Sequence, residues 1–205
     1  MGDDFGVIFA AAISGEHRGK PLGIADVVWE SGCAWSCKTI KSEDPFTQKN
    51  ARLISGRNSP IYSSGIENPL ADIQATGAAV LGVWNARVNE AFNEFDDVRI
   101  FVMLRNFSTL HFTFFEEAAE RFVPGNYEWR KNKRGNLEAI DKATGEHVFT
   151  WQPHGGQFTA IRNVPSSCYR FRIKKRPGLI EEQHVINLCG FQDDWIVPVA
   201  AGATP

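Results

Sequence analysis

The sequence predicts one α/β (α+β) domain, in which helices and strands alternate in the first half and short strands fill the second half. Two observations indicate this class. Apolar residues recur at helical spacing near the N-terminus and again over residues 69–95. Beyond residue 125, short β-like runs are separated by turn signals rich in Gly and Asn. A chain of 205 residues is long enough to bury a sizeable core in one domain, which we expect to span 1–205.

The first predicted element is a helix over residues 3–14. Its apolar side chains fall at i, i+3, i+4 and i+7 from Phe5 to Ala12, which places them on one face. Gly15 is a typical residue with which to end such a helix.

Two short strands are predicted next, over residues 24–29 and 33–40, joined by a tight turn at 30–32. This hairpin would bring Asp26 and Lys38 to one end of a small sheet. A carboxylate beside an ammonium group suits metal-assisted phosphodiester hydrolysis, because the carboxylate holds a divalent cation and the lysine positions the attacking water.

The middle of the chain is expected to hold a loop, a long helix that Pro69 begins, two paired strands and a short helix. These elements are, in order, residues 41–64, 69–95, 99–105, 110–115 and 116–122.

The second half is expected to add strands that extend or flank the same sheet. The predicted strands are residues 126–132, 137–141, 147–151, 157–161 and 169–175. We therefore expect residues 1–122 to form an α/β core and residues 123–196 to form a β-rich part of the same domain.

The composition is that of an ordinary globular protein, with 43% hydrophobic and 22% charged residues. No apolar run approaches the roughly 18 residues needed to cross a bilayer, so we expect no membrane association. The first residues lack the basic region of a secretory signal, which favours a cytoplasmic protein. The four cysteines form no metal-binding pattern, and we interpret them as buried free thiols.

Charge is unevenly distributed along the chain. Residues 99–176 hold 14 Lys and Arg against 7 Asp and Glu, although the whole chain carries a net charge of −2. Such asymmetry allows a basic face to meet a polyanion. Chance clustering on solvated strand edges is the alternative interpretation.

The order of motifs in the first 60 residues identifies a family. A helix with the pattern Phe-Gly-x-x-Phe precedes a loop with Glu16, a strand with Asp26, and a strand with the text Gly-Cys-Ala-Trp-Ser-Cys-Lys-Thr-Ile-Lys. This order and spacing resemble the PD-(D/E)xK nuclease superfamily, in particular type II restriction endonucleases. The later half matches only loosely in architecture.

The resemblance implies a restriction-endonuclease-like central mixed sheet flanked by helices, and a Mg²⁺-dependent cut of double-stranded DNA by a homodimer. Asp26 would be a metal ligand, and the backbone carbonyl of Cys37 would be a second. Lys38 would orient the attacking water or stabilise charge at phosphorus.

The triplet departs from the family in its first residue, because Ser36 stands where Glu or Asp is usual and cannot supply negative charge. A carboxylate from elsewhere would then complete the site. Glu30 and Glu43 are candidates, and Glu16 is favoured over Asp72.

A second departure lies in the first helix. Gly6 occupies a position where such helices often carry Glu, and a glycine inside a helix costs about 1 kcal/mol relative to Ala.

Two polar loops are candidate DNA contacts. The loop 53–60 carries Arg57, Asn58 and Ser59, whose side chains and neighbouring amides can grip a phosphate. The segment 151–159 carries side chains that can read base edges, namely Gln152, His154, Gln157 and Thr159. The alternative for both segments is a turn whose polar groups hold its own backbone.

The predicted last strand alternates basic and apolar residues, which would place Arg172 and Lys174 on a cationic face toward phosphates. Without DNA, such a strand is simply an edge strand protected by charge.

Three other functions remain open at the level of the sequence. Ser36 and Gly6 motivate a DNA-binding domain that has kept the fold and lost catalysis. A DNA repair or junction nuclease would use the same site for another purpose. A hydrolase with Cys37 as nucleophile would need a histidine brought near by the fold.

Overall fold

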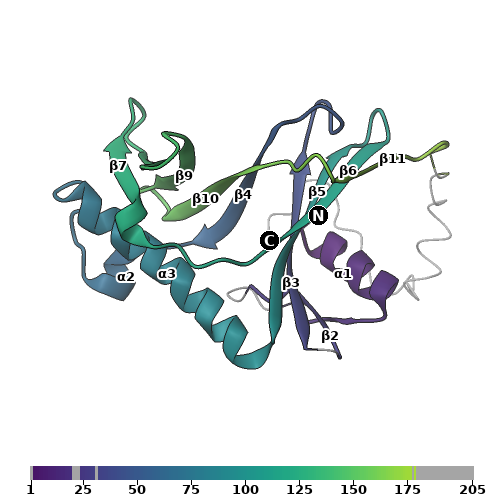
Figure 1. The fold of residues 1–205 in the computed structure, drawn as a ribbon, viewed down its shortest axis with the longest axis horizontal. Coiled ribbons are helices and arrows are strands. Elements are labelled where there is room, and N and C mark those ends of the chain that lie inside the picture. Colours follow the sequence, from purple (N-terminus) through teal and green to yellow (C-terminus); the bar gives the residue numbers. More distant parts are fainter. Residues whose placement is uncertain (1, 20–23, 31, 177, 179–205) are drawn as a thin grey trace, which may run out of the picture. The chain divides into compact units, whose positions relative to one another are not determined.

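The computed structural model describes residues 2–19, 24–30, 32–176 and 178 (Figure 1). The chain divides into a compact unit, Met1–Arg172, and a smaller unit, Ile173–Pro205. Every helix and strand of the described residues belongs to the first unit.

A mixed sheet forms the centre of this unit, with the strand order β1-β2-β3-β5-β6-β11. Strands β1 to β3 form an antiparallel meander, and β5 then lies parallel to β3 along the whole length of β3. The strands are β1 (Glu16–His17), β2 (Val27–Trp29), β3 (Cys33–Lys41), β5 (Asp97–Asn106), β6 (His111–Ala118) and β11 (Tyr169–Arg172).

An antiparallel sheet with the strand order β4-β10-β9-β8-β7 completes the unit. Its strands are β4 (Asn50–Arg57), β7 (Tyr127–Lys131), β8 (Leu137–Asp141), β9 (His147–Gln152) and β10 (Gln157–Asn163). A short 3₁₀ helix, η1 (Pro124–Asn126), precedes β7. Each sheet includes one strand from the other half of the chain. Strand β4, from the first half, lies in the antiparallel sheet, and β11, from the second half, lies in the mixed sheet.

Helices pack on both faces of the mixed sheet. On one face, α1 (Gly2–Ile13) buries Phe5 and Ala10 against Val27 and Cys37. On the other face, α3 (Ile73–Glu94) packs in a larger core shared with the antiparallel sheet. Strand β3 therefore lies between two apolar layers, which fixes its register against β5.

Helix α3 packs as its sequence predicts, although it begins after Asp72 and not at Pro69. Asp72 caps it by accepting a hydrogen bond from the amide of Ala75 at 2.9 Å. Its buried residues recur every three or four positions, from Thr76 to Ala91. The predicted helix over 69–95 is confirmed, with a start four residues later.

The stretch 41–64, expected to be a loop, contains a strand and a helix, β4 and α2 (Pro60–Ser64). In β4 only Ala51 and Leu53 are buried apolar residues, and the strand pairs with β10 on one side. An edge strand with so few apolar side chains gives a weak pattern in the sequence.

The prediction of a short helix over residues 116–122 is wrong. Glu116 and Glu117 lie on β6, opposite Phe101 and Ile100. Pairing with β5 and an ion pair between Glu117 and Arg162 outweigh the helix propensity of this acidic, alanine-containing run.

The coarse fold class is confirmed as α+β, with one mixed and one antiparallel sheet. The second half mostly builds its own sheet, and only β11, which ends at Arg172, extends the mixed sheet. Across the described residues, no helix combines the length and apolarity needed to cross a membrane.

Two glycines of α3 give a matched test of packing. The Trp129 indole lies directly against Gly77, so a Cβ there would overlap the ring, whereas Gly82 faces open space. We expect Gly77→Ala to lower the free energy of unfolding by about 1–3 kcal/mol. Gly82→Ala should raise it by up to about 1 kcal/mol, because alanine favours helix. Urea unfolding measures both, and equal effects would contradict this packing.

Candidate functional site

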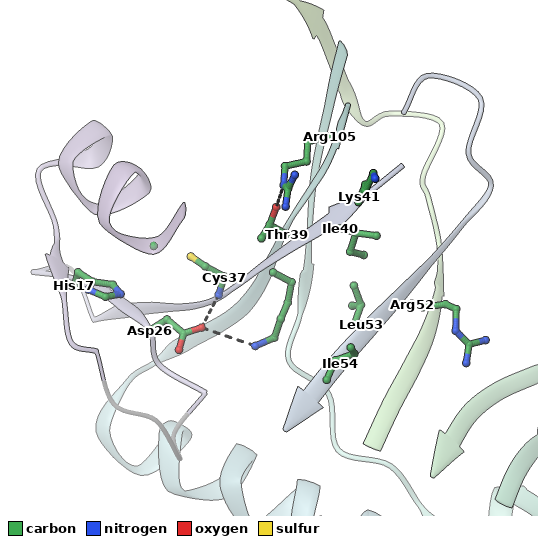
Figure 2. Close-up of a pocket in the computed structure, with 12 residues that line it drawn as sticks. His17, Asp26, Cys37, Thr39, Ile40, Lys41, Arg52, Leu53, Ile54 and Arg105 are labelled. Carbon is green, nitrogen blue, oxygen red and sulfur yellow. Dashed lines mark hydrogen bonds and ion pairs between the residues drawn. The ribbon is translucent and has the colours of Figure 1, made fainter. Parts of the chain in front are cut away.

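A cleft of about 580 Å³ opens between β3 and β4 (Figure 2). Residues 37–41 of β3 line one wall and residues 52–54 of β4 line the other. Gly6 of α1 also lines the cleft. His17 and Asp26 lie at the end nearest α1 (Figure 2). The cleft exists because β2 covers only residues 33–35 of β3, which leaves the rest of that edge unpaired by β2.

Asp26 lies where β2 stops pairing with β3. Its backbone amide donates to the carbonyl of Trp35 at 2.8 Å. Its side-chain Oδ2 then accepts the amide of Cys37 at 2.8 Å and the hydroxyl of the buried Ser36 at 3.3 Å. The carboxylate therefore accepts the amide hydrogen bond of Cys37 that a backbone carbonyl would accept if β2 continued to pair with β3.

Lys38 reaches the same carboxylate oxygen, with Nζ 3.9 Å from Oδ2 of Asp26. The two side chains are 25% and 26% exposed, so the pair remains open to a ligand from solvent. The structure brings Asp26, Ser36, Cys37 and Lys38 together at one place, as the hairpin predicts.

Two oxygens in this cluster are suited to a hard cation. The second carboxylate oxygen of Asp26, Oδ1, has no hydrogen bond within the described part of the chain. Because the N–H and C=O of one strand residue point to the same edge, the Cys37 carbonyl lies on the edge that its amide shares with Asp26. No cluster of three His, Cys, Asp or Glu side chains suitable for a metal occurs among the described residues.

The structure does not bring the other candidate carboxylates to the cleft. Glu16 is exposed on β1, where strand alternation turns it away from its neighbour His17. Asp72 is exposed and caps α3. Glu30 and Glu43 are also exposed and do not line the cleft.

His17 occupies the space beside Gly6 of α1. A Cβ on Gly6 would lie 2.8 Å from both Cδ2 and Nε2 of the His17 ring. A helix glycine therefore makes room for an imidazole that lines the cleft (Figure 2). His17 is not among the site residues predicted from the sequence, although its place next to Glu16 on a two-residue strand period is a signal that can identify it.

Three further cations line the far part of the cleft, namely Lys41, Arg52 and Arg105. Arg105 donates from Nε to Thr39 at 2.8 Å, and Arg52 donates to Thr150. Among the described residues that line the cleft, Asp26 is the only one with an acidic side chain. The cleft is therefore cationic, as a site for a phosphodiester requires. The sequence does not identify Arg52 as a site residue, because it predicts a loop where Arg52 lies on β4.

Cys37 is a poor nucleophile in this setting. Burial, together with the nearby charge of Asp26, raises the pKa of its thiol to about 12. The side chain is 7% exposed and packs under α1. A neutral, buried thiol cannot attack a substrate at physiological pH, so we set aside the hydrolase that uses Cys37.

The two predicted DNA-contacting loops meet at a second concavity of about 480 Å³, which Arg57, Ser59 and Gly156 help to line. The amide of Asn58 donates to the carbonyl of Gly156 at 2.7 Å. Arg57 is exposed and Ser59 is half-buried.

Asn58 itself is fully buried, and its side chain bonds to Val80 and Arg87. We therefore assign Asn58 a structural role in place of the DNA contact expected from the sequence.

The segment 151–159 forms the β9–β10 hairpin. His154 is exposed at its turn, and Gln152 and Gln157 are half-buried partners at its end. Thr159 is only 4% exposed, which corrects its assignment as a base-reading residue. Arg172 is exposed on β11, and Lys174 is exposed in the smaller unit.

Comparison with protein-family models, curated proteins and solved structures finds no match to this chain.

The state of Cys37 can be tested by alkylation. We expect iodoacetamide at pH 8 to leave Cys37 unmodified in the native protein, because its pKa of about 12 keeps it protonated and α1 covers it. Peptide mass spectrometry measures the modification, and guanidinium should make the same thiol reactive. Native modification at the rate of a free thiol would contradict this environment.

Proposed function

We propose that this chain is a metal-dependent endonuclease that cuts double-stranded DNA at specific sites. The observation that carries the proposal is the Asp26–Lys38 pair, 3.9 Å apart at the open edge of β3 in an otherwise cationic cleft. A partly exposed carboxylate and ammonium in such a cleft are the groups that phosphodiester hydrolysis needs.

The donor atoms fit Mg²⁺ that keeps most of its water. Mg²⁺ is usually held by one or two carboxylates together with water and substrate phosphate. Asp26 supplies one carboxylate, and the Cys37 carbonyl supplies a neutral oxygen on the same edge. When bound, the ion would neutralise a phosphate oxygen and lower the pKa of its water ligand. Because the described lining of the cleft holds one carboxylate, we expect tight binding only when DNA is present.

The remaining residues have separate roles in this proposal. Ser36 and the Cys37 amide hold the Asp26 carboxylate in position through its Oδ2. Lys38 orients the attacking water or stabilises the charge that develops at phosphorus. Lys41, Arg52 and Arg105 attract the DNA backbone along the cleft.

The topology supports the same proposal. Along the chain, α1, β1, β2 and β3 come first, and α3 and β5 follow after β4 and α2. Within the mixed sheet, the antiparallel meander of β1 to β3 is followed by the parallel strand β5, with a helix on each face. This arrangement agrees with the central mixed sheet flanked by helices that the resemblance to restriction endonucleases implies. A homodimer that reads a palindromic site belongs to the proposal as well.

DNA contacts outside the cleft are proposed at the second concavity. Arg57 and Ser59 would contact phosphates, and Gln152, His154 and Gln157 lie on the adjoining hairpin where they can approach bases. The exposed Arg172 and Lys174 would add phosphate contacts.

A DNA-binding domain without catalysis is the second candidate. It is favoured by the presence of one carboxylate among the cleft residues that the structure describes. The two candidates separate in one assay on plasmid DNA with Mg²⁺ or EDTA. Discrete fragments with Mg²⁺ alone indicate the endonuclease, whereas intact DNA with a salt-sensitive gel shift indicates the binding domain. Non-specific or structure-dependent cutting would indicate the repair or junction nuclease.

Substitutions in the pair test the catalytic assignment. Asp26→Asn keeps an acceptor for the Cys37 amide and removes the charge, and Lys38→Ala removes the ammonium. We expect each to lower the cleavage rate by about 100- to 1000-fold, with the free energy of unfolding little changed. Initial rates on plasmid DNA measure this effect. Cleavage by both variants at the original rate would refute the assignment.

The two carboxylates favoured by the sequence provide matched controls. Because Glu16 and Asp72 do not line the cleft, we expect Glu16→Ala and Asp72→Ala to retain cleavage within a few-fold. Asp72→Ala should cost about 1 kcal/mol of stability through loss of the α3 cap. A loss of cleavage as large as that of Asp26→Asn would instead identify the missing metal ligand.

A further inference from the structure

Arg52 lines the cleft from the β4 wall, and its side chain is held across the antiparallel sheet. Its neighbours Ala51 and Leu53 are buried in the core, so strand alternation turns Arg52 to the opposite face of that sheet. Its Nη2 donates to Oγ1 of Thr150 at 3.2 Å. Thr150 belongs to β9, and β10 lies between β4 and β9, so the side chain passes over one strand to reach it. Figure 2 shows it extending from β4 on the side away from β3.

The Thr150 hydroxyl is a buried anchor for this side chain. Thr150 is 4% exposed, and its Oγ1 lies 3.1 Å from Nε2 of His147. The same Nε2 lies 2.7 Å from the carbonyl oxygen of Phe149, which can only accept, so Nε2 carries a hydrogen. The imidazole and the guanidinium of Arg52 therefore meet at one buried oxygen. An oxygen held in this way gives the guanidinium a fixed position.

The charge of Arg52 stays available for a ligand. Carboxylates neutralise other arginines of the chain, as Asp97 does for Arg99 at 2.7 Å. The hydrogen bond of Arg52 is to a neutral hydroxyl, and Glu138 on the adjoining strand β8 accepts from Asn132 at 2.7 Å instead. An arginine has five N–H donors, so an exposed guanidinium anchored through Nη2 keeps donors for a phosphate. Arg52 is therefore both held in place and uncompensated in charge.

We propose that Thr150 is a positioning residue that holds Arg52 for a phosphate of duplex DNA beside the scissile phosphate. The proposal rests on the proposed function in one respect, that duplex DNA occupies the cleft. Asp26 and Lys38 lie at the open edge of β3, whereas Arg52 comes from β4, so we assign Arg52 to a flanking phosphate. A guanidinium that is already held loses less conformational freedom when DNA binds. Thr150 is too buried to touch DNA and acts through Arg52.

The test is binding of a short labelled DNA duplex to the full chain at low salt in EDTA, followed by fluorescence anisotropy. We expect Thr150→Val to weaken binding by about 3- to 10-fold, the cost of ordering one long side chain expressed as an affinity ratio. Thr150→Ser keeps the hydroxyl and should bind like the original protein. Thermal melting verifies folding, and Thr150→Ala removes the same hydroxyl if the valine variant is unstable.

Thr159→Val is the matched control. Thr159 lies opposite Thr150 on β10 and is equally buried, at 4% exposure. Opposed residues of paired strands share a face, so both threonines lie on the side of the sheet that Arg52 crosses. Because the guanidinium bonds to Thr150, the control should leave the affinity for the duplex unchanged.

A double-mutant cycle separates positioning from a purely structural effect. In the Arg52→Ala background, Thr150→Val should cause no further loss of affinity, because the side chain that it positions is absent. Arg52→Ala alone should reduce the slope of log K against log salt by about 0.9, the value for one phosphate contact to duplex DNA. Thr150→Val keeps the cation and should leave that slope unchanged.

Equal affinity of Thr150→Val and the original protein would overturn the proposal. An equal loss from Thr150→Val with and without Arg52 would also overturn it, as would a failure to bind the duplex at low salt. A failure of the proposed function gives a different result: the two substitutions are coupled in EDTA as expected, while plasmid DNA stays intact with Mg²⁺.

Discussion

The hydrogen bond from the Cys37 amide to the Asp26 carboxylate is the contact on which the site depends. Strand β2 leaves β3 after three paired residues, and this side chain serves as the next acceptor along the exposed edge. The bond fixes one carboxylate oxygen, Oδ2, and Oδ1 has no hydrogen bond to the described residues. A contact that completes a sheet edge therefore also positions a charge beside Lys38.

Two apolar layers keep that edge in place. Helix α1 packs on the face that contains Cys37, and the larger core with α3 packs on the face that contains Ala34. Strand β4 diverges from β3 because it pairs with β10 in the other sheet. The cleft is therefore a consequence of the topology, and its cations come from strands that belong to two different sheets.

Much of this arrangement follows from sequence patterns. The helices 3–14 and 69–95, the hairpin carrying Asp26 and Lys38, and most later strands follow from periodicity and turn residues. Strand β4 does not, because its edge position leaves two buried apolar residues as the only signal. The acidic run at 116–118 has helix propensity that pairing with β5 overrides. The burial of Asn58 and Thr159, and the fit of His17 beside Gly6, arise from contacts between distant segments.

The central claim is that Asp26 holds a cation beside the Cys37 carbonyl. Anomalous diffraction from crystals grown with Mn²⁺ and a short DNA duplex tests it most directly. We expect a peak at about 2 Å from Oδ1 of Asp26 and from the Cys37 carbonyl oxygen, with the Cys37 amide still bonded to Oδ2. An anomalous map with DNA in the cleft and no peak at Asp26 would show that this carboxylate only completes the sheet edge, and would contradict the claim.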